Sequence, residues 1–175
     1  SLSGSAHSYL PVQSTYEDSL FEKSIPYIKD LQEDASLVKQ YAWLAYSNGG
    51  LFAISILPIL YTYAYIERRS QCFYYVALGA GCSACCNILK LFNHQPRPFW
   101  VDPDLSAFSC NNQFGNPSGH SFLSMGVALG VWLDYNSRTS SESRWWVRYS
   151  LLVAVFAFAG TIAFSRMFLG VHSIN

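Results

Sequence analysis

The stretch LFAISILPILYTYAYI, Leu51 to Ile66, is the core of an uncharged run that begins at Tyr41. A run of this length can cross a bilayer, because about 20 consecutive apolar residues span the hydrocarbon core as a helix. Pro58 lies inside it and is expected to kink the helix, which membrane helices tolerate when neighbouring groups satisfy the freed backbone. The stretch therefore predicts a transmembrane helix.

Three more apolar runs follow along the chain. They are Cys72 to Lys90, Ser118 to Asp134, and Tyr149 to Ser165. With the first run they predict four spans and an all-α fold, a multi-pass transmembrane helical bundle. The last two runs are short enough to leave an alternative open, which is a buried helix in a soluble all-α protein.

Polarity divides the chain into two parts. Residues 1–40 are polar and charged and contain Pro26, so they are expected to form short amphipathic helices on a membrane surface or on the protein. Residues 41–175 are expected to form the transmembrane domain.

Composition agrees with a membrane protein. The chain is 51% hydrophobic and 13% charged, whereas an average soluble domain is about 25% charged. Its net charge is zero, so no nucleic-acid partner is expected, and the lipid bilayer is the expected surrounding. The odd number of cysteines, 5, argues against a disulfide framework. The CxxCC cluster at Cys82 has no second ligand cluster with matching spacing, so we expect packing thiols and no metal site.

Basic residues indicate the orientation. One face of the expected bundle carries Arg68, Arg69, Arg138, Arg144 and Arg148. The opposite face carries the loop 92–117, whose only Lys or Arg is Arg97. The positive-inside rule makes the first face cytoplasmic, so the second is expected to be non-cytoplasmic, and the organelle is not indicated.

The first polar cluster on that second face is KLFNHQPRP, Lys90 to Pro98. Pro96 and Pro98 hold Arg97 between them in an extended backbone. A guanidinium restrained in this way loses little freedom when its planar fork binds two phosphate oxygens. The alternative is a pair of basic side chains snorkelling at the membrane edge.

The second cluster is FGNPSGHSF, Phe114 to Phe122. Asn116 is a good helix N-cap and Pro117 a good first helical residue, so a helix is expected to start there. Its first N–H groups would point at an anion, with the Ser118 hydroxyl beside them and Gly119 allowing close approach. His120 would then lie within a turn of the anion and could protonate a leaving oxygen. The alternative is an ordinary capped helix with an interfacial histidine.

The third cluster is SRMFLGVHS, Ser165 to Ser173. Arg166 and His172 are six residues apart, which places them on different faces of a continuous helix. Gly170 could end the helix and bring His172 back towards Arg166, so a break is predicted from Leu169 to Val171. Because this face should be poor in Lys and Arg, an Arg there indicates a functional reason.

Together the clusters place three cations, a helix N-terminus, a serine and two histidines on one membrane face. This set suits phosphoryl transfer without a metal or other cofactor, since cations can stabilise the phosphate oxygens while one imidazole attacks and the other donates a proton. The motifs K-x6-RP, PSGH and SR-x5-H, from Lys90 to His172, resemble the three signature motifs of the type 2 phosphatidic acid phosphatase superfamily. That superfamily includes lipid phosphate phosphatases, glucose-6-phosphatases and vanadium haloperoxidases.

The resemblance implies a metal-independent phosphatase that acts on a phosphomonoester through a phosphohistidine. His172 would be the nucleophile, His120 the acid and then the base, and Arg166 a further catalytic group. The implied phosphate-binding residues are Lys90, Arg97, Ser118, Gly119 and Arg166. The family motif continues to an Asp four residues after the histidine and then to a final span, so the sequence, which ends at Asn175, is expected to stop before its last helix.

The substrate class stays open at this stage. A site at the membrane surface favours a lipid phosphate such as phosphatidic acid, whose tail stays in the bilayer. The RPFW run, Arg97 to Trp100, is similar to the corresponding stretch of glucose-6-phosphatases, so a sugar phosphate is an alternative. A catalytically silent structural subunit is a second alternative, and a haloperoxidase is disfavoured because those relatives are soluble. Nothing in the sequence indicates an oligomeric state.

Overall fold

The computed structural model describes residues 15–33, 35–65, 68–106, 112–139 and 145–174. Within these ranges the chain is helical and contains no strand. The helices are α1 Thr15–Glu33, α2 Leu37–Ala64, α3 Arg69–Asn93, α4 Pro98–Val101, α5 Gly119–Arg138 and α6 Trp145–Phe168. The fold class expected from the sequence, an all-α transmembrane bundle, is confirmed.

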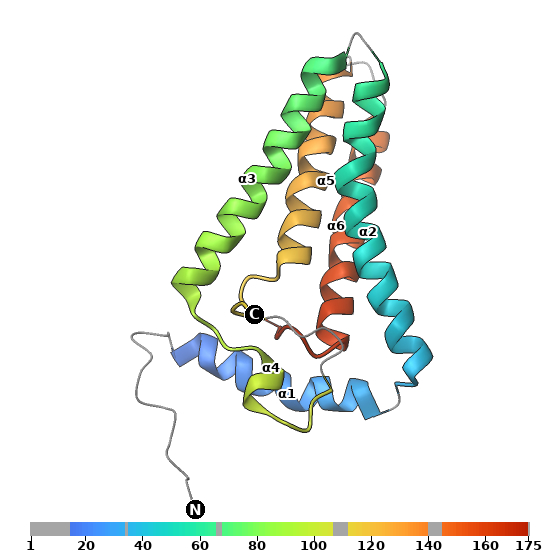
Figure 1. Ribbon diagram of the computed structural model, residues 1–175. Helices are drawn as coiled ribbons and strands as arrows, with labels where there is room; N and C mark the ends of the chain where they lie inside the picture. The colour runs from blue at the N-terminus through green and yellow to red at the C-terminus, as the bar shows by residue number, and fades with distance from the viewer. Residues whose placement is uncertain (1–14, 34, 66–67, 107–111, 140–144, 175) are drawn as a thin grey trace, which may run out of the picture.

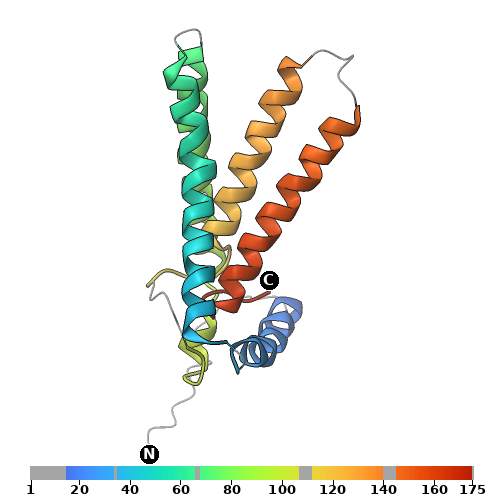
Figure 2. The same ribbon diagram turned by 90° about the vertical axis from the view of Figure 1, so that its right-hand side faces the viewer.

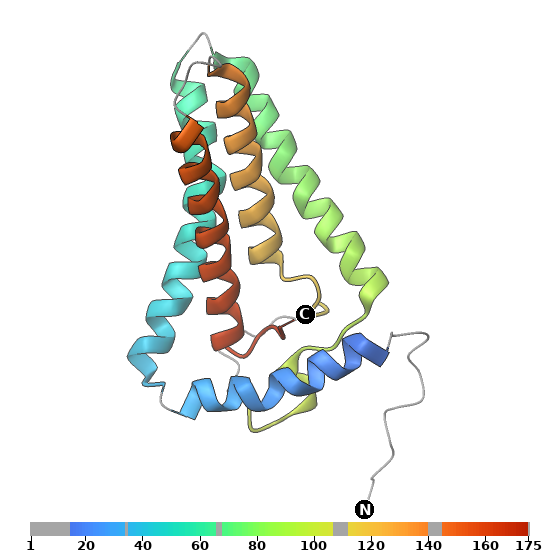
Figure 3. The same ribbon diagram turned by 180° about the vertical axis from the view of Figure 1, so that it is seen from behind.

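The four long helices α2, α3, α5 and α6 run up and down in chain order, and α1 lies across one end of them (Figures 1 and 3). We call this the α1 end; α3 and α6 finish there and α5 begins there. At the opposite end α2 finishes, α3 begins and α5 finishes. The pair α2 and α3 diverges from the pair α5 and α6 towards the opposite end (Figure 2). Because the helices alternate in direction, the three polar clusters of the sequence all come to the α1 end.

Among the residues that the structure describes, three helical segments are long and apolar enough to cross a membrane, namely Leu37–Ala64, Arg69–Val101 and Trp145–Phe168. The expected span Ser118–Asp134 forms α5, but α5 is not among them, so the predicted number of four spans is not reached on length and composition. The reason lies in packing. Helix α5 contacts α2, α3 and α6, so polar residues on it, such as Ser124, are buried against protein instead of facing lipid.

In the described part of the polar N-terminal segment, residues 15–33 form one helix, α1, and not the expected short helices. Pro26 lies inside α1 and is exposed. Phe21, Ser24 and Ile28 are spaced three and four residues apart, so they share one face of the helix, and all three are buried. Packing of that face therefore outweighs the backbone hydrogen bond that proline removes. Helix α2 already begins at Leu37, whose N-cap Ser36 accepts a hydrogen bond from the Lys39 N–H. The division at residue 40 stays a prediction.

The predicted break after α6 is confirmed. The helix ends at Phe168, and Gly170 has a φ of 70°, a left-handed conformation that favours glycine. A Cβ at Gly170 would lie 2.7 Å from Nε2 of Gln32 on α1 and 3.0 Å from the Ser106 carbonyl oxygen. The same Gln32 amide donates to the carbonyl oxygens of Phe168 and Ser106. Helix α1 therefore holds the turn that directs the chain from α6 to His172.

Candidate active site

A cavity of about 310 Å³ lies at the α1 end, between α2, α3, α5 and α6. All but one of the candidate residues line it: Lys90, Arg97, Gly119, His120, Arg166 and His172. Leu51 and Leu123 add apolar wall from α2 and α5. Ser118 is the exception, because it is outside the lining, and its Oγ accepts a weak hydrogen bond of 3.5 Å from the Ser121 N–H.

Lys90 and Arg97 reach the cavity from α3 and from the turn after it. Arg97 has the extended backbone that the flanking prolines predict, with φ −81° and ψ 150°, and only 1% of it is exposed. Its Nε donates to the Gln113 carbonyl oxygen at 2.7 Å and its Nη1 to the Val171 carbonyl oxygen at 2.9 Å. Lys90 Nζ donates to Gln113 Oε1 at 2.9 Å. One residue, Gln113, thus fixes both cations.

Helix α5 begins two residues later than the sequence indicates. The N-cap is Ser118, with an extended backbone at φ −66° and ψ 121°, and Gly119 is the first helical residue. Asn116 and Pro117 therefore lie outside the helix, and their expected roles as N-cap and first residue are wrong. Serine and asparagine cap helices about equally well, so the conformation of the preceding loop, and not capping propensity, decides which of them is the N-cap. A Cβ on Gly119 would lie 3.7 Å from Lys90 Nζ, so the backbone at the helix start faces a cation.

His120 is oriented by a residue that the sequence did not reveal. Its Nε2 donates to Oδ1 of Asn48 on α2 at 2.8 Å, since a carbonyl oxygen can only accept. This leaves Nδ1 as the other ring nitrogen for chemistry in the cavity. Asn48 lies 72 residues away in a mostly apolar helix, and only its polarity there could have marked it.

His172 is 5% exposed and lies after the break at Gly170. Its Nδ1 donates to the Gly115 carbonyl oxygen at 2.6 Å, so the lone pair of the neutral ring is on Nε2. Burial lowers the pKa of His172 well below its ordinary value, and the positive charges of Arg97 and Arg166 lower it further. The ring is therefore neutral at neutral pH, which is the form that can attack phosphorus.

Arg166 supplies the third cation from the last turn of α6 and is 3% exposed. Its Nε is buried and has no hydrogen-bond partner among the described residues. No carboxylate in the described ranges forms an ion pair with Arg166, Lys90 or Arg97. Buried charge without a counter-ion is unfavourable, so the cavity is suited to an anion.

Gln113 and Gly115 were also missed by sequence reasoning. Gln113 acts through its backbone carbonyl and its side-chain amide, and Gly115 acts through its backbone carbonyl. Such groups form no recognisable sequence motif. A Cβ on Gly115 would lie 3.1 Å from the Pro96 carbonyl oxygen, and the Gly115 N–H donates to the Gln95 carbonyl oxygen. The loop before α5 thus packs on the Arg97 turn, and a larger residue at position 115 would force the Pro96 carbonyl to shift. A glycine before NPSGH was the available signal.

Within the described ranges, no three His, Cys, Asp or Glu side chains gather as potential metal ligands. The described cysteines, Cys72, Cys82, Cys85 and Cys86, are free thiols. Metal independence itself stays a prediction.

Comparison with known proteins identifies the family of the chain. No curated protein sequence matches the chain. Its fold is similar to that in the crystal structure of a transmembrane PAP2-type phosphatidylglycerolphosphate phosphatase from Bacillus subtilis, with a TM-score of 0.70 and 15% identity over 90% of this chain and 76% of that one. The PAP2 superfamily model matches residues 70–175, which contain all three motifs. The chain therefore belongs to the PAP2 superfamily, as its sequence motifs indicate.

Proposed function

We propose that this chain is an integral membrane phosphatase that hydrolyses a phosphomonoester, with a lipid phosphate as its substrate. The observation that supports this most directly is the cavity at the α1 end, where three buried cations meet two imidazoles and no carboxylate of the described residues. A phosphate dianion would supply the missing negative charge. Arg97 and Lys90 are already fixed by Gln113, so little ordering remains when phosphate binds.

In the first step, Nε2 of His172 attacks phosphorus while the bond from phosphorus to the alcohol oxygen breaks. The Gly115 carbonyl holds the Nδ1 proton, which keeps the attacking lone pair on Nε2 and stabilises the positive ring of the phosphohistidine. Arg166 and Arg97 contact the equatorial oxygens, where negative charge is stabilised in the transition state.

His120 enters this step as the imidazolium, with a proton on each ring nitrogen, and gives one of them to the leaving alcohol oxygen. In the second step, His120 takes a proton from water, the oxygen of that water attacks phosphorus, and the bond to His172 breaks to release inorganic phosphate. Asn48 accepts from Nε2 of His120, so we assign the moving proton to Nδ1. After both steps each histidine has returned to its starting state.

A lipid tail is favoured by the walls of the cavity and by the surroundings. Leu51 on α2 and Leu123 on α5 line the cavity on helices packed within a bundle that has three candidate spans. The structural relative is named for a lipid phosphate substrate, phosphatidylglycerolphosphate. A sugar phosphate and a catalytically silent subunit remain the alternatives, and one experiment separates them. By the distribution of basic residues, the site opens on the non-cytoplasmic face.

The test is phosphate release from a panel of lipid and sugar phosphates, measured in detergent with EDTA present. We expect release from phosphatidic acid to exceed release from glucose 6-phosphate, with no loss on adding EDTA and with inhibition by vanadate. The His172→Ala variant should lose turnover by at least about 10³-fold, because the nucleophile is gone. Brief incubation with ³²P-labelled substrate should label wild-type protein in an acid-labile, base-stable form.

The variant must still fold, which its elution and melting temperature in detergent report. Turnover near the wild-type level in a folded His172→Ala protein would exclude the nucleophile assignment. Faster release from glucose 6-phosphate would support the sugar phosphatase. A folded wild-type protein without activity on the whole panel would favour the silent subunit.

A further inference from the structure

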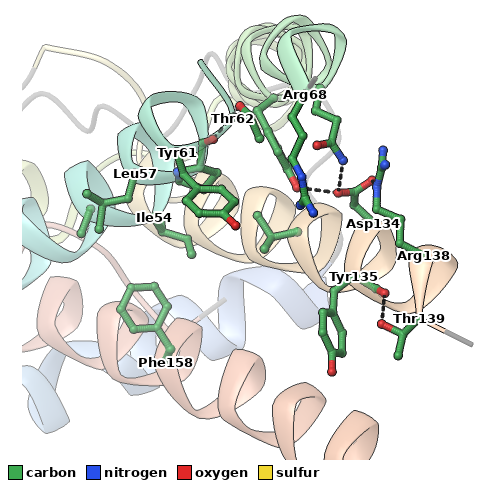
Figure 4. A pocket seen from close by; sticks show the side chains of 15 residues that line it. Ile54, Leu57, Tyr61, Thr62, Arg68, Asp134, Tyr135, Arg138, Thr139 and Phe158 are labelled. Carbon is green, nitrogen blue, oxygen red and sulfur yellow. Dashed lines mark hydrogen bonds and ion pairs between the residues drawn. The ribbon is translucent and has the colours of Figure 1, made fainter. Parts of the chain in front are cut away.

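A second cavity, of about 780 Å³, lies at the opposite end of the bundle and shares no lining residue with the active site. Helices α2, α3, α5 and α6 all contribute to its wall. Figure 4 shows its two parts: Ile54, Leu57 and Phe158 lie at one side, and Arg68, Asp134 and Arg138 at the other. Its volume is in the range of about 300–1,000 Å³ that is usual for ligand sites.

The polar part of the cavity lies where α2 ends, α3 begins and α5 ends. Asp134 is close to the end of α5, and Arg68 is the N-cap residue of α3. The apolar part extends along α2 and α6 towards the middle of the helices, where Ile54 and Phe158 lie. A site that is polar at the helix ends and apolar at their middle matches an amphiphile aligned with the membrane normal.

The polar part contains an acceptor that lacks a donor. Gln71 is 5% exposed, and its Nε2 donates to Asp134 Oδ2 at 3.2 Å. Its Oε1 is buried and has no hydrogen-bond partner among the described residues. A buried acceptor without a donor is unfavourable, and this one belongs to a side chain that lines the cavity and donates to a carboxylate. A ligand that brings an N–H donor with positive charge would satisfy Gln71 Oε1 and lie beside the negative charge of Asp134.

Arg68 supplies positive charge at the rim of the same cavity. Its guanidinium lies over the Tyr61 ring, 6.0 Å from the centroid, and both residues line the cavity. No carboxylate of the described residues forms an ion pair with Arg68, whereas Arg138 is paired with Asp134 at 2.7 Å. The rim thus presents one cation that is suited to a phosphate, next to the acceptors suited to an ammonium group.

We propose that this cavity binds a membrane phospholipid whose head carries a primary ammonium group. The ammonium group donates to Gln71 Oε1 beside the Asp134 carboxylate, the phosphate lies at Arg68, and an acyl chain follows Leu57 and Phe158. The lipid phosphate is a diester, so this ligand is not a substrate of the kind proposed for the active site. The site is therefore separate in place and in chemistry.

The test compares two photoactivatable lipids that differ only in the head. The protein is reconstituted in vesicles that contain a trace of phosphatidylethanolamine or phosphatidylcholine, each with a diazirine in the acyl chain. The trimethylammonium of phosphatidylcholine cannot donate a hydrogen bond. We expect phosphatidylethanolamine to label the peptides of α2 and α6 at least about fivefold more, equivalent to about 1 kcal/mol.

Variants assign the contacts. Arg68→Ala should lower labelling by both lipids, and Arg69→Ala is the matched control, because Arg69 is adjacent but lies over Tyr63 and is outside the cavity lining. Gln71→Leu should remove the preference for phosphatidylethanolamine and leave the labelling by phosphatidylcholine. Ala53→Trp fills the apolar part and should lower labelling by both lipids. Phosphate release should be unchanged in these variants, since none of these residues lines the active site.

Equal labelling by the two lipids in the wild-type protein would overturn the proposal, and this arm needs no variant to fold. An equal loss from Arg68→Ala and Arg69→Ala would also overturn it, because it would indicate only a basic surface. Labelling confined to peptides outside α2 and α6 would mean that the cavity holds water or detergent. The proposal does not depend on phosphatase activity, so an inactive protein leaves the test valid.

Discussion

The two ends of the bundle hold charged side chains in opposite ways. At the α1 end, Lys90, Arg97 and Arg166 are each at most 7% exposed, and no carboxylate of the described residues pairs with them. At the opposite end a single carboxylate, Asp134, accepts hydrogen bonds from three side chains of α3 and α5. The first arrangement is incomplete without an anion, whereas the second largely satisfies its own charge.

The difference indicates where the fold gives up stability for function. Burying like charges together without a counter-ion destabilises the folded state, whereas a carboxylate with three donors links helices. A cluster that the protein cannot satisfy by itself is therefore the better indicator of a binding site. The same removal of charge should then have opposite effects on stability at the two ends.

The largest effect that distinguishes the ends is expected from Arg166→Met. Phosphate release should fall by at least about 10²-fold, as when one donor to a developing charge is removed. The variant should unfold at a higher temperature than the wild type when no anion is present, because a buried Nε without a partner costs about 1–3 kcal/mol. Vanadate should raise the melting temperature of the wild type more than that of the variant.

Arg138→Met is the matched control at the opposite end. Arg138 donates to Asp134 at 2.7 Å, so its loss should lower the melting temperature and leave turnover per folded molecule unchanged. If Arg166→Met lowered the melting temperature as Arg138→Met does, the contrast between the two ends would be wrong.

A smaller effect, on stability alone, is expected from Asp134→Leu. The change leaves the Gln71 amide and the Tyr75 hydroxyl without their acceptor, and both residues are buried. Each orphaned donor costs about 1–3 kcal/mol, so thermal unfolding in detergent should shift to lower temperature. Asp134→Asn keeps an acceptor and should shift less. A stable Asp134→Leu protein would show that the network does not link the helices.

Asn48→Ala tests orientation at the α1 end without a change of charge. The loss of one hydrogen bond to His120, worth about 1 kcal/mol, should lower kcat by about five- to tenfold, with KM little changed. Asn48→Asp keeps the acceptor and should recover part of kcat. Its carboxylate should also hold the imidazole proton, so the alkaline limb of the pH–rate profile should move to higher pH. A structural role alone would change neither the pH profile nor kcat selectively.

Sequence reasoning succeeded where local chemistry decides the outcome. Uncharged runs predicted α2, α3 and α6, and Gly170 predicted the break that returns the chain to Arg166, because only a few residues tolerate that backbone. The flanking prolines likewise predicted the extended backbone of Arg97. Convergence of the three clusters followed from the alternating direction of the helices.

It failed where contacts between distant segments decide the outcome. Asn48, Gln113 and Gly115 hold His120, Lys90 and His172 through bonds that span 72, 23 and 57 residues, and no local pattern encodes such pairs. Helix α5 runs the length of the bundle as expected, but the sequence did not reveal that its neighbours would bury polar residues such as Ser124. The second cavity was not foreseen either, since its lining comes from four helices.

The smallest effect is expected from Lys29→Ala, which removes a partly exposed ion pair at the α1 end. Lys29 lies 2.7 Å from Asp102 and 3.3 Å from Asp104, and its hydrogen bond to Asp102 raises the pKa of Lys29 and lowers that of Asp102. The pair is therefore fully charged at neutral pH, and its contribution is lost as pH falls through the lowered pKa of Asp102 or rises through the raised pKa of Lys29. Exposed pairs contribute little and are screened by salt.

The melting temperature of Lys29→Ala should thus lie slightly below that of the control Lys23→Ala at low salt, and the two should coincide at high salt. Lys23 and Lys29 carry the same charge on the same helix, so the comparison isolates the ion pair as the variable. If Lys29→Ala lowered the melting temperature as much as Asp134→Leu, the loss of stability on removing a charge would not depend on how many buried groups that charge satisfies. The contrast between the two ends would then need a different cause.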